Sequence, residues 1–266
     1  MSQPAFTGTV AENYEKYFSP MFFAVPARDI AGRIPVNIES VLELACGTGQ
    51  VTRLLKDRFP DAKIIGTDLF PGMIEVAKSI TGEDSGIKWK TMDATDISFE
   101  DDLFDAVVCQ FGVMFFPDKQ KAFNEAYRVL KPGGTFIFST WDTIEKQHIA
   151  EVNVEVVNSF FPNDPVTFFD IPFSMSDPSE MEELMNGAGF KNVSIEYVDL
   201  EGSTASAEEA AKGFLLGNPI YNYICERDEN LLPEILSAVR ERFAKEFGAG
   251  AFKIPLSVIV SSGTKS

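Results

Sequence analysis

The regular alternation of strand-like and helix-like segments between residues 41 and 141 constrains the fold of this chain more than any other feature. Five short runs rich in β-branched and aromatic residues are expected to be strands: Val41–Ala45, Lys63–Thr67, Ile87–Met92, Phe104–Gln110 and Thr135–Trp141. Apolar residues between these runs recur at helical spacing. Strands that alternate with helices form a parallel sheet with right-handed crossovers, so the sequence predicts an α/β, doubly wound fold with helices on both faces.

The rest of the chain adds two strands and two helical regions to this core. Val193–Leu200 and Leu256–Ser262 are rich in β-branched residues and are predicted to be the sixth and seventh strands of the same sheet. Residues 1–37 and 201–254 have largely helical patterns, and neither carries an obvious core of its own. We expect both to be helical lid segments over the carboxyl ends of the strands, where doubly wound sheets bind their ligands.

Composition limits the classes of protein and partner. Of the 266 residues 45% are hydrophobic, which is enough for a sizeable core and excludes a disordered chain. The net charge of −17 repels phosphate backbones and anionic lipids, so neither a nucleic acid nor a membrane is an expected partner. Cys46, Cys109 and Cys225 form no C-x-x-C motif, and no signal peptide or transmembrane stretch is visible, which favours the cytoplasm. With His148 as the one histidine, no His-based metal centre is expected.

The strongest local signal is the segment Val41-Leu-Glu-Leu-Ala-Cys-Gly-Thr-Gly-Gln50, in which an apolar strand runs into a glycine turn. Gly47 and Gly49 carry no Cβ, so a ligand can approach the backbone and the N–H groups at the start of the following helix. A tight strand–helix turn without any ligand would use the same glycines. The turn alone therefore leaves both interpretations open.

Two aspartates at the ends of the following strands give this turn chemical partners. Thr52 stands where a dinucleotide fingerprint requires its third glycine, so a pyrophosphate-binding turn is not supported. Asp68 lies 21 residues after Gly47, where a carboxylate can accept both hydroxyls of a ribose. Asp93 follows the third strand and could bond an adenine amino group, although capping the next turn is an equal alternative. Met73 could lie against the adenine face, or simply belong to the core.

Five motifs follow one another between Val41 and Trp141: Glu43-Leu-Ala-Cys-Gly-Thr-Gly49, Gly66-Thr-Asp68, Asp93-Ala94, Phe104-Asp-Ala-Val-Val-Cys-Gln110 and Arg128-Val-Leu-Lys-Pro-Gly-Gly134. In order and spacing they resemble the class I S-adenosylmethionine-dependent methyltransferases. A helix expected at Met181–Gly187 and the last two strands are also similar to that family. The resemblance implies a seven-stranded, mostly parallel sheet whose last strand is antiparallel, S-adenosyl-L-methionine as cofactor and S-adenosyl-L-homocysteine as product.

By this resemblance, residues at the strand ends would hold the cofactor. Glu43 would orient the glycine loop, and the backbone of Ala45, Cys46 and Gly47 would contact the methionine part, with Gly49 completing the loop. Ala45 departs from the glycine that many relatives carry there, which narrows the loop slightly. Asp68 would bind the ribose. Leu69 and Met73 would flank the adenine faces, and Asp93 and Ala94 would contact the adenine edge. Gln110 and Phe111 would face the amino-acid end of the cofactor and its methyl group. For Gln110, satisfying a buried loop is an alternative.

The cofactor motifs do not specify the acceptor side, and no catalytic residue is assigned, because a general base is needed only when the acceptor must lose a proton. Tyr14 and Tyr17 lie three apart in a helical segment and would share one face. Phe115 could line an apolar pocket, and His148 follows the fifth strand where a base could stand. Tyr221 and Tyr223 are further substrate candidates. An apolar ceiling over the site is expected from Phe160, Phe161, Phe168, Phe169 and Phe173. Packing or surface roles are alternatives for all of them.

The sequence therefore predicts a methyltransferase that moves a methyl group in line from S-adenosylmethionine to a small-molecule acceptor. The alternatives are a non-catalytic protein that binds an adenosine ligand and an NAD-dependent oxidoreductase, against which Thr52 argues. We expect one domain over residues 1–266. Its expected parts are an N-terminal helical lid (1–37), a cofactor-binding core (38–141), a helix with the sixth strand (142–200), a helical insertion (201–254) and the last strand (255–266).

Overall fold

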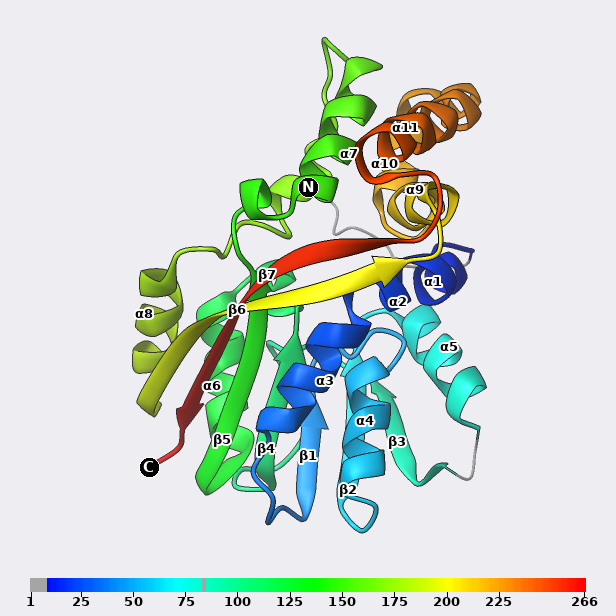
Figure 1. Cartoon of the computed structure of the whole chain (residues 1–266). Helices are drawn as coiled ribbons and strands as arrows, with labels where there is room; N and C mark the ends of the chain where they lie inside the picture. Colours follow the sequence, from blue (N-terminus) through cyan, green and yellow to red (C-terminus); the bar gives the residue numbers. More distant parts are fainter. Residues whose placement is uncertain (1–8, 83–84) are drawn as a thin grey trace.

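A seven-stranded sheet forms the centre of the computed structural model, which describes residues 9–82 and 85–266 (Figure 1). The strands are β1 (Ser40–Glu43), β2 (Lys63–Asp68), β3 (Ile87–Thr91), β4 (Phe104–Gln110), β5 (Leu130–Trp141), β6 (Lys191–Thr204) and β7 (Phe252–Thr264). Their order in the sheet is β3-β2-β1-β4-β5-β7-β6. The chain therefore builds outward from β1 to β3 and then returns to β4, which makes the β1–β4 boundary the point where such sheets bind ligands.

Strand β1 lies in the middle of the parallel part of the sheet. Val41 is paired with Ile64 of β2 on one side and with Ala106 of β4 on the other. All four residues of β1 are buried, as expected of a strand with helices on both faces. Because the strands are parallel, the ends of β1, β2 and β4 meet at one edge of the sheet.

The last strand is antiparallel, as the resemblance implied. β7 lies between β5 and β6 and pairs antiparallel with both, with Trp141 opposite Val258. The two final strands are longer than the expected Val193–Leu200 and Leu256–Ser262. Beyond the end of β5 they continue to pair with each other, up to Thr204 opposite Phe252, and this two-stranded ribbon reaches the lid helices (Figure 1).

Two expected strand boundaries differ from the structure because of backbone geometry. β1 ends at Glu43, before Ala45, because Ala45 adopts φ 51° and leaves the extended conformation. β5 begins already at Leu130, before the expected Thr135, so residues 131–134 lie within the strand. Its pairing with β4 is irregular there, and Gly133 adopts φ 80°.

Helices cover both faces of the sheet (Figure 1). Helices α3 (Ala24–Arg33) and α4 (Gln50–Arg58) pack together on one face, and α6 (Lys119–Val129) and α8 (Pro178–Ala188) on the other. Helix α5 (Pro71–Thr81) packs on β2 and β3. The α8 helix contains the expected Met181–Gly187 segment, and the side chain of Asp177 caps its first turn.

A helical lid lies above the carboxyl edge of the sheet (Figure 1). Its N-terminal part is α1 (Thr9–Asn13), the π-helix η1 (Tyr14–Phe18) and α2 (Ser19–Phe22). Its other helices are α7 (His148–Ser159), α9 (Ala207–Leu216), α10 (Ile220–Asp228) and α11 (Leu232–Phe247). Short helical turns complete the connections: η3 (Val113–Phe115), η4 (Ile144–Lys146), η5 (Phe168–Asp170) and η6 (Glu229–Leu231). Most residues of 9–37 and 205–251 lie in these helices, whereas residues 201–204 belong to β6 and residues 252–254 to β7.

Aromatic rings hold the two halves of the lid together. The ring of Phe214 in α9 meets the rings of Phe18 and Phe22 edge to face, with centroids 5.4 and 5.2 Å apart.

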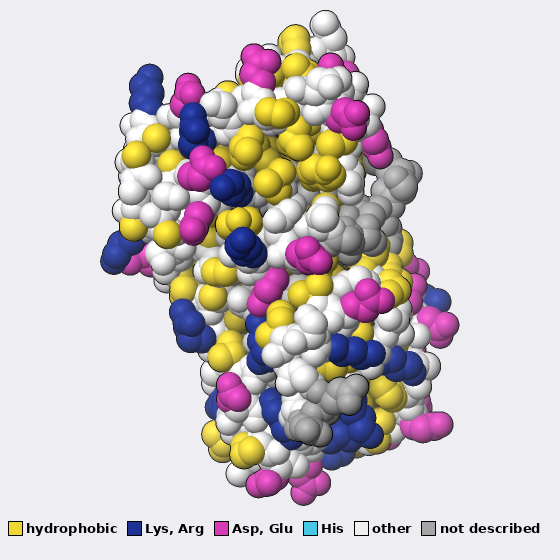
Figure 2. Space-filling model, turned by 90° about the vertical axis from the view of Figure 1, so that its right-hand side faces the viewer, with side chains coloured by type: hydrophobic (Ala, Val, Ile, Leu, Met, Phe, Trp, Pro, Cys, Tyr) yellow, Lys and Arg dark blue, Asp and Glu magenta, His cyan; other side chains and the backbone are white. Residues whose placement is uncertain are grey.

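On the face seen in Figure 2, hydrophobic side chains gather in the upper half of the molecule, where the lid lies, whereas Lys and Arg side chains gather lower down. Among the described residues, no helix is both long and apolar enough to cross a membrane.

Candidate functional site

A cavity with about 1290 Å³ of empty space, part of it open to solvent, lies between the carboxyl edge of the sheet and the lid. We call it the large chamber. Its lower wall comes from the ends of β1 to β3 and includes Gly47, Asp68 and Asp93. Its upper wall is aromatic and includes Phe22, Phe111, Trp141, Phe168, Phe173 and Phe214. The tips of the three predicted loops therefore converge on one space, as the sequence argument required.

A second, more polar cavity adjoins the large chamber. This small chamber holds about 310 Å³ of empty space. Tyr14, Phe23, Ala45, Gly47 and Gln110 line both chambers. Glu43, Cys46, Thr48 and Gln50 line the small chamber alone. A ligand with one apolar and one charged end could therefore extend from one chamber into the other across Gly47.

The two glycines of the turn serve different purposes. Gly47 adopts φ 55°, and a Cβ added to it would meet no atom within 4 Å, so its open side faces the chambers. Gly49 also has a positive φ, but its Cβ position is occupied by the indole of Trp89. Gly49 lines neither chamber. Both glycines were expected to admit a ligand; Gly47 leaves open space at the chambers, whereas Gly49 makes room for a side chain of β3.

Asp68 connects the first two loop tips. Its Oδ2 accepts a hydrogen bond from the backbone N–H of Gly47 at 2.9 Å, and its Oδ1 accepts one from Phe70 at 2.9 Å. The side chain is 6% exposed, and burial raises the pKa of its carboxyl although these N–H donors oppose the shift. Leu69 and Met73, which follow it, line the large chamber on the same side.

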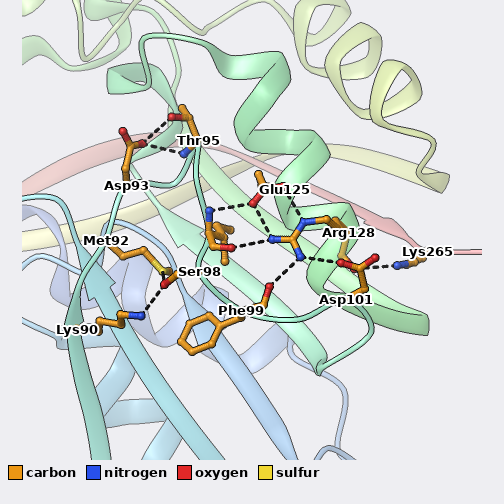
Figure 3. A network of polar contacts seen from close by, with 11 residues as sticks. Lys90, Met92, Asp93, Thr95, Ser98, Phe99, Asp101, Glu125, Arg128 and Lys265 are labelled. Carbon is orange, nitrogen blue, oxygen red and sulfur yellow. Dashed lines mark hydrogen bonds and ion pairs between the residues drawn. The ribbon is translucent and has the colours of Figure 1, made fainter.

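Asp93 has the capping role, and it also lies at the wall of the large chamber. Its Oδ1 accepts hydrogen bonds from Thr95, from the backbone N–H at 2.8 Å and from the hydroxyl at 2.9 Å, which is the capping role (Figure 3). The residue also lines the large chamber beside Met92 and Ala94, and it is exposed there. The capping bonds thus hold the carboxylate at the chamber wall.

A polar network below the chamber holds the loop that carries Asp93 (Figure 3). Arg128 donates hydrogen bonds to the carbonyl oxygens of Ile97 and Phe99 at 2.7 and 2.8 Å, and it pairs with Asp101 at 2.7 Å. Glu125 pairs with Arg128 and accepts a hydrogen bond from the N–H of Ile97. This arginine therefore explains why the Arg128–Gly134 motif accompanies the loop after β3.

Glu43 is a buried acid at the base of the small chamber. It is 1% exposed and accepts a hydrogen bond from the hydroxyl of Thr52. Burial raises its pKa to about 8, because little solvent reaches the carboxylate and the bond from Thr52 only partly offsets this. Thr52, at the position of the missing third glycine, therefore serves the acid of β1. Among the described residues, Ser19 Oγ, Gln50 Oε1 and Gln110 Oε1 lie buried around this chamber without a hydrogen-bond partner.

Three contacts join the N-terminal lid to the strand ends. Gln110 donates from Nε2 to the carbonyl oxygen of Phe23 at 3.1 Å. Glu15 accepts a hydrogen bond from Thr48 at 2.5 Å and pairs with Arg53 at 3.1 Å. The lid thus closes the small chamber through polar contacts from two elements.

The two lid tyrosines do not share a face. Tyr14 lines both chambers, and burial together with the nearby Glu15 and Asp68 raises the pKa of its hydroxyl well above the usual value. Tyr17 lines neither and lies near Lys16 and Lys212, whose ammonium groups are 4.9 and 5.9 Å from its ring. The expectation assumed an α-helix, but residues 14–18 form a π-helix, whose wider turn separates positions three apart.

Three other acceptor candidates also lie outside both chambers. His148 bridges Glu151 and Glu246 at 3.3 and 3.0 Å on the outer surface of α7. Tyr223 packs on Phe168, and Tyr221 lies beside Cys225. Of the predicted ceiling, Phe168, Phe169 and Phe173 line the large chamber with Phe115, whereas Phe160 and Phe161 do not. Sequence reasoning missed Phe22, Phe23, Phe214 and Asn218, which line it from the lid.

Comparison with known proteins identifies a related family. Residues 42–138 match the family model of a methyltransferase domain. The demethylmenaquinone methyltransferase of Thermus thermophilus is 40% identical over 99 residues, which are 36% of this chain and 44% of that protein. That of Lactococcus lactis is 30% identical over 192 residues, covering 65% of this chain and 73% of that protein. The match to the Thermus protein thus spans less than half of its length.

Solved structures share the fold. The phosphoethanolamine N-methyltransferase 2 of Haemonchus contortus, crystallised with S-adenosyl-L-methionine, superposes with a TM-score of 0.62. Its sequence is 18% identical, and the superposition covers all of this chain and 60% of that one. At this identity the likeness shows the fold alone.

Proposed function

The chain belongs to the class I S-adenosylmethionine-dependent methyltransferases, and on that premise we propose that it methylates a small apolar acceptor. The observation that carries the proposal is the hydrogen bond from Gly47 N–H to Asp68, because it joins the glycine loop and the carboxylate of β2 at one cavity wall. Asp93 completes the wall from β3. These are the three positions at which the family binds its cofactor.

The residues present fit S-adenosylmethionine. Asp68 would bind the ribose hydroxyls, and Leu69, Met73, Asp93 and Ala94 would surround the adenine, since all five line the large chamber. The amino-acid end carries an ammonium and a carboxylate, and the small chamber offers buried groups for both. Glu43 and the unpartnered oxygens of Gln110 and Ser19 line it. The Cβ position of Gly47, which is open, leaves room for the ligand to pass between the two chambers.

When bound, S-adenosylmethionine supplies a methyl group already activated on a sulfonium sulfur for in-line transfer. The protein's own contribution is then to hold the acceptor at the correct place and to exclude water. Such positioning can lower the activation free energy by about 7–11 kcal/mol. The aromatic upper wall, with Phe111, Trp141 and Phe173, provides a water-poor surface for this purpose.

The chemistry of the large chamber points to a flat, apolar acceptor. Rings line most of its upper part, and aromatic walls favour flat ligands through offset or edge-to-face contacts. The curated relatives named as demethylmenaquinone methyltransferases support an apolar ring compound. The acidic surface disfavours nucleic acid, so we propose a small molecule as the partner.

Calorimetry with S-adenosylhomocysteine, and NAD as the control, tests the cofactor. We expect saturable binding of S-adenosylhomocysteine at one site and no heat from NAD. Radiolabelled S-adenosylmethionine with a panel of naphthols and naphthohydroquinones then tests transfer. Tight cofactor binding with no labelled product across the panel would favour a non-catalytic binding protein. The absence of cofactor binding would overturn the proposal.

A further inference from the structure

Asn218 brings a polar side chain into the apolar part of the large chamber. It lies between α9 and α10, in the helical insertion, and is 1% exposed. Phe214, one turn earlier, lines the same chamber. Gly217, which precedes Asn218, would have its Cβ 3.1 Å from Cβ of Phe18, so this stretch of backbone is packed tightly against the N-terminal lid.

The orientation of this amide is fixed by the backbone. The N–H of Ile220 donates a hydrogen bond to Oδ1 of Asn218 at 2.9 Å, which closes a local turn. This bond assigns Oδ1 as the atom that accepts from the backbone and leaves Nδ2 as a donor. Pro219 restricts the conformation of the residue before it, which makes the turn stiff. Within the described residues, Nδ2 of Asn218 has no hydrogen-bond partner. A buried N–H without a partner is costly, so a ligand atom that accepts its hydrogen bond would be strongly favoured.

Asn218 stands apart from the proposed cofactor contacts. The polar side chains of the lower wall, Asp68 and Asp93, come from the ends of β2 and β3, whereas Asn218 comes from the lid. It does not line the small chamber, where the amino-acid end of the cofactor would lie. Asn218 therefore lines the large chamber outside the proposed cofactor contacts.

We propose that Asn218 determines acceptor specificity by donating a hydrogen bond from Nδ2 to an oxygen carried on the apolar ring of the acceptor. The inference rests on the proposed function and adds the chemical class of the group that is recognised: a carbonyl or other oxygen that accepts a hydrogen bond. A site built to hydrogen-bond a ligand group rejects the analogue that lacks it, because its own polar atom is then left unpaired.

A pair of probes that differ in one oxygen tests this role. 1-Tetralone carries a carbonyl that can only accept a hydrogen bond, and tetralin has the same ring system without the oxygen. Binding of both is measured by calorimetry on the full chain saturated with S-adenosylhomocysteine. The wild type should bind 1-tetralone about tenfold more tightly than tetralin.

Two variants remove the donor in different ways. Asn218→Ser keeps a side-chain oxygen for the N–H of Ile220 and deletes Nδ2, and Asn218→Leu keeps the volume and deletes both polar atoms. In each, the preference for 1-tetralone should disappear while the affinity for S-adenosylhomocysteine stays within about twofold. Asn124→Ser, the same exchange at an exposed position of α6, is the matched control and should behave as the wild type.

The outcomes are separable. An equal preference in the wild type and both variants overturns the role of Asn218, and so does a wild type that binds neither probe or prefers tetralin. Failure of the wild type to bind S-adenosylhomocysteine instead overturns the proposed function. If Asn218→Leu does not fold, Asn218→Ser decides alone, because its turn hydrogen bond is retained.

Discussion

The ring of Phe111 lies flat on the indole of Trp141, with ring centroids 3.9 Å and planes 6° apart. Phe111 follows β4 and Trp141 ends β5, so the stack joins two neighbouring strand ends at the wall of the large chamber. Phe111 also adopts φ 52°, which is unfavourable for a bulky side chain. The stack therefore holds a strained backbone conformation beside the proposed site of chemistry.

This strain predicts an unusual order of stability. Phe111→Ala removes the stack but keeps a Cβ, whereas Phe111→Gly removes the stack and relieves the backbone. We expect Phe111→Gly to be more stable than Phe111→Ala by about 1 kcal/mol, although glycine ordinarily destabilises relative to alanine. Urea unfolding of the two variants measures the difference, and Phe138→Ala against Phe138→Gly, in the extended backbone of β5, is the control with the opposite order. A common order at both sites would contradict the strain.

Removal of the carboxylate that joins the two loops should weaken cofactor binding. Asp68→Ala deletes the acceptor of the Gly47 and Phe70 N–H groups as well as the proposed ribose contact. Loss of hydrogen bonds to a charged group costs about 1.5–3 kcal/mol, so the affinity for S-adenosylhomocysteine should fall by about one to two orders of magnitude. Asp96→Ala, at an exposed position of the next loop, should leave that affinity unchanged. Calorimetry at equal pH measures both, and equal affinities in the two variants would rule out the assigned role of Asp68.

The two turn glycines should separate binding from folding. Gly47→Ala places a methyl group in open space at a left-handed position, so we expect a stability loss of about 1 kcal/mol and a clear loss of affinity for S-adenosylhomocysteine. Gly49→Ala drives a methyl group into the ring of Trp89 and should destabilise the fold by about 1–3 kcal/mol in addition to its strain. Thermal unfolding and calorimetry on both variants check this. The reverse assignment, with stability lost at Gly47 and kept at Gly49, would refute the geometry of the turn.

Glu43 should make stability fall as pH rises. Its folded pKa is raised to about 8, above the usual 4.5, so the folded state binds the proton more tightly than the unfolded state. The stabilisation is fully present below pH 4.5 and is lost between there and about pH 8, by up to about 5 kcal/mol. Glu43→Gln keeps an acceptor for Thr52 and should lack this slope. Urea unfolding of the two proteins between pH 5 and 9 compares them, and parallel profiles would argue against a buried, uncharged acid.

His148 should contribute in the same direction but weakly. Its hydrogen bond to Glu246 raises the pKa of the imidazole, partial burial opposes this shift, and the bond to Glu151 adds to it. The charged bridge between α7 and α11 is therefore present at low pH and is lost as the pH rises through the folded pKa. The side chain is 55% exposed, so solvent screening limits the effect to about 0.5 kcal/mol. His148→Ala should lose that amount at pH 5.5 and nothing at pH 9, with unchanged affinity for S-adenosylhomocysteine. A loss of methyl transfer with intact cofactor binding would instead restore His148 as a candidate base.

The parallel core could be predicted from sequence because its signals are local. Strands β1, β2 and β4 are short, largely apolar runs, and β3 alternates apolar residues with lysines. The motif residues stand at strand ends, whose position in a doubly wound sheet follows from topology. The position of Asp68 and Asp93 at one edge of the sheet could therefore be predicted from the sequence. Gly47 followed for the same reason.

The remaining differences come from interactions between distant parts of the chain. Gly49 faces Trp89 because β3 lies beside β2, and no spacing near residue 49 shows that. Tyr17 is turned away by a π-helix that a helical pattern cannot distinguish from an α-helix. Asn218 enters the chamber only because the insertion folds back over the sheet, and a single asparagine before a proline carries no periodic signal.

The proposed double use of Asp68, for the two loops and for a ribose, has a consequence for the energetics of recognition. A carboxylate offers about four lone-pair positions, and the two N–H donors from the protein occupy two of them. An incoming diol can therefore be received without displacing either donor. The entropy of ordering both loops is lost when the chain folds and not when the nucleoside arrives, so more of the contact energy is retained as affinity.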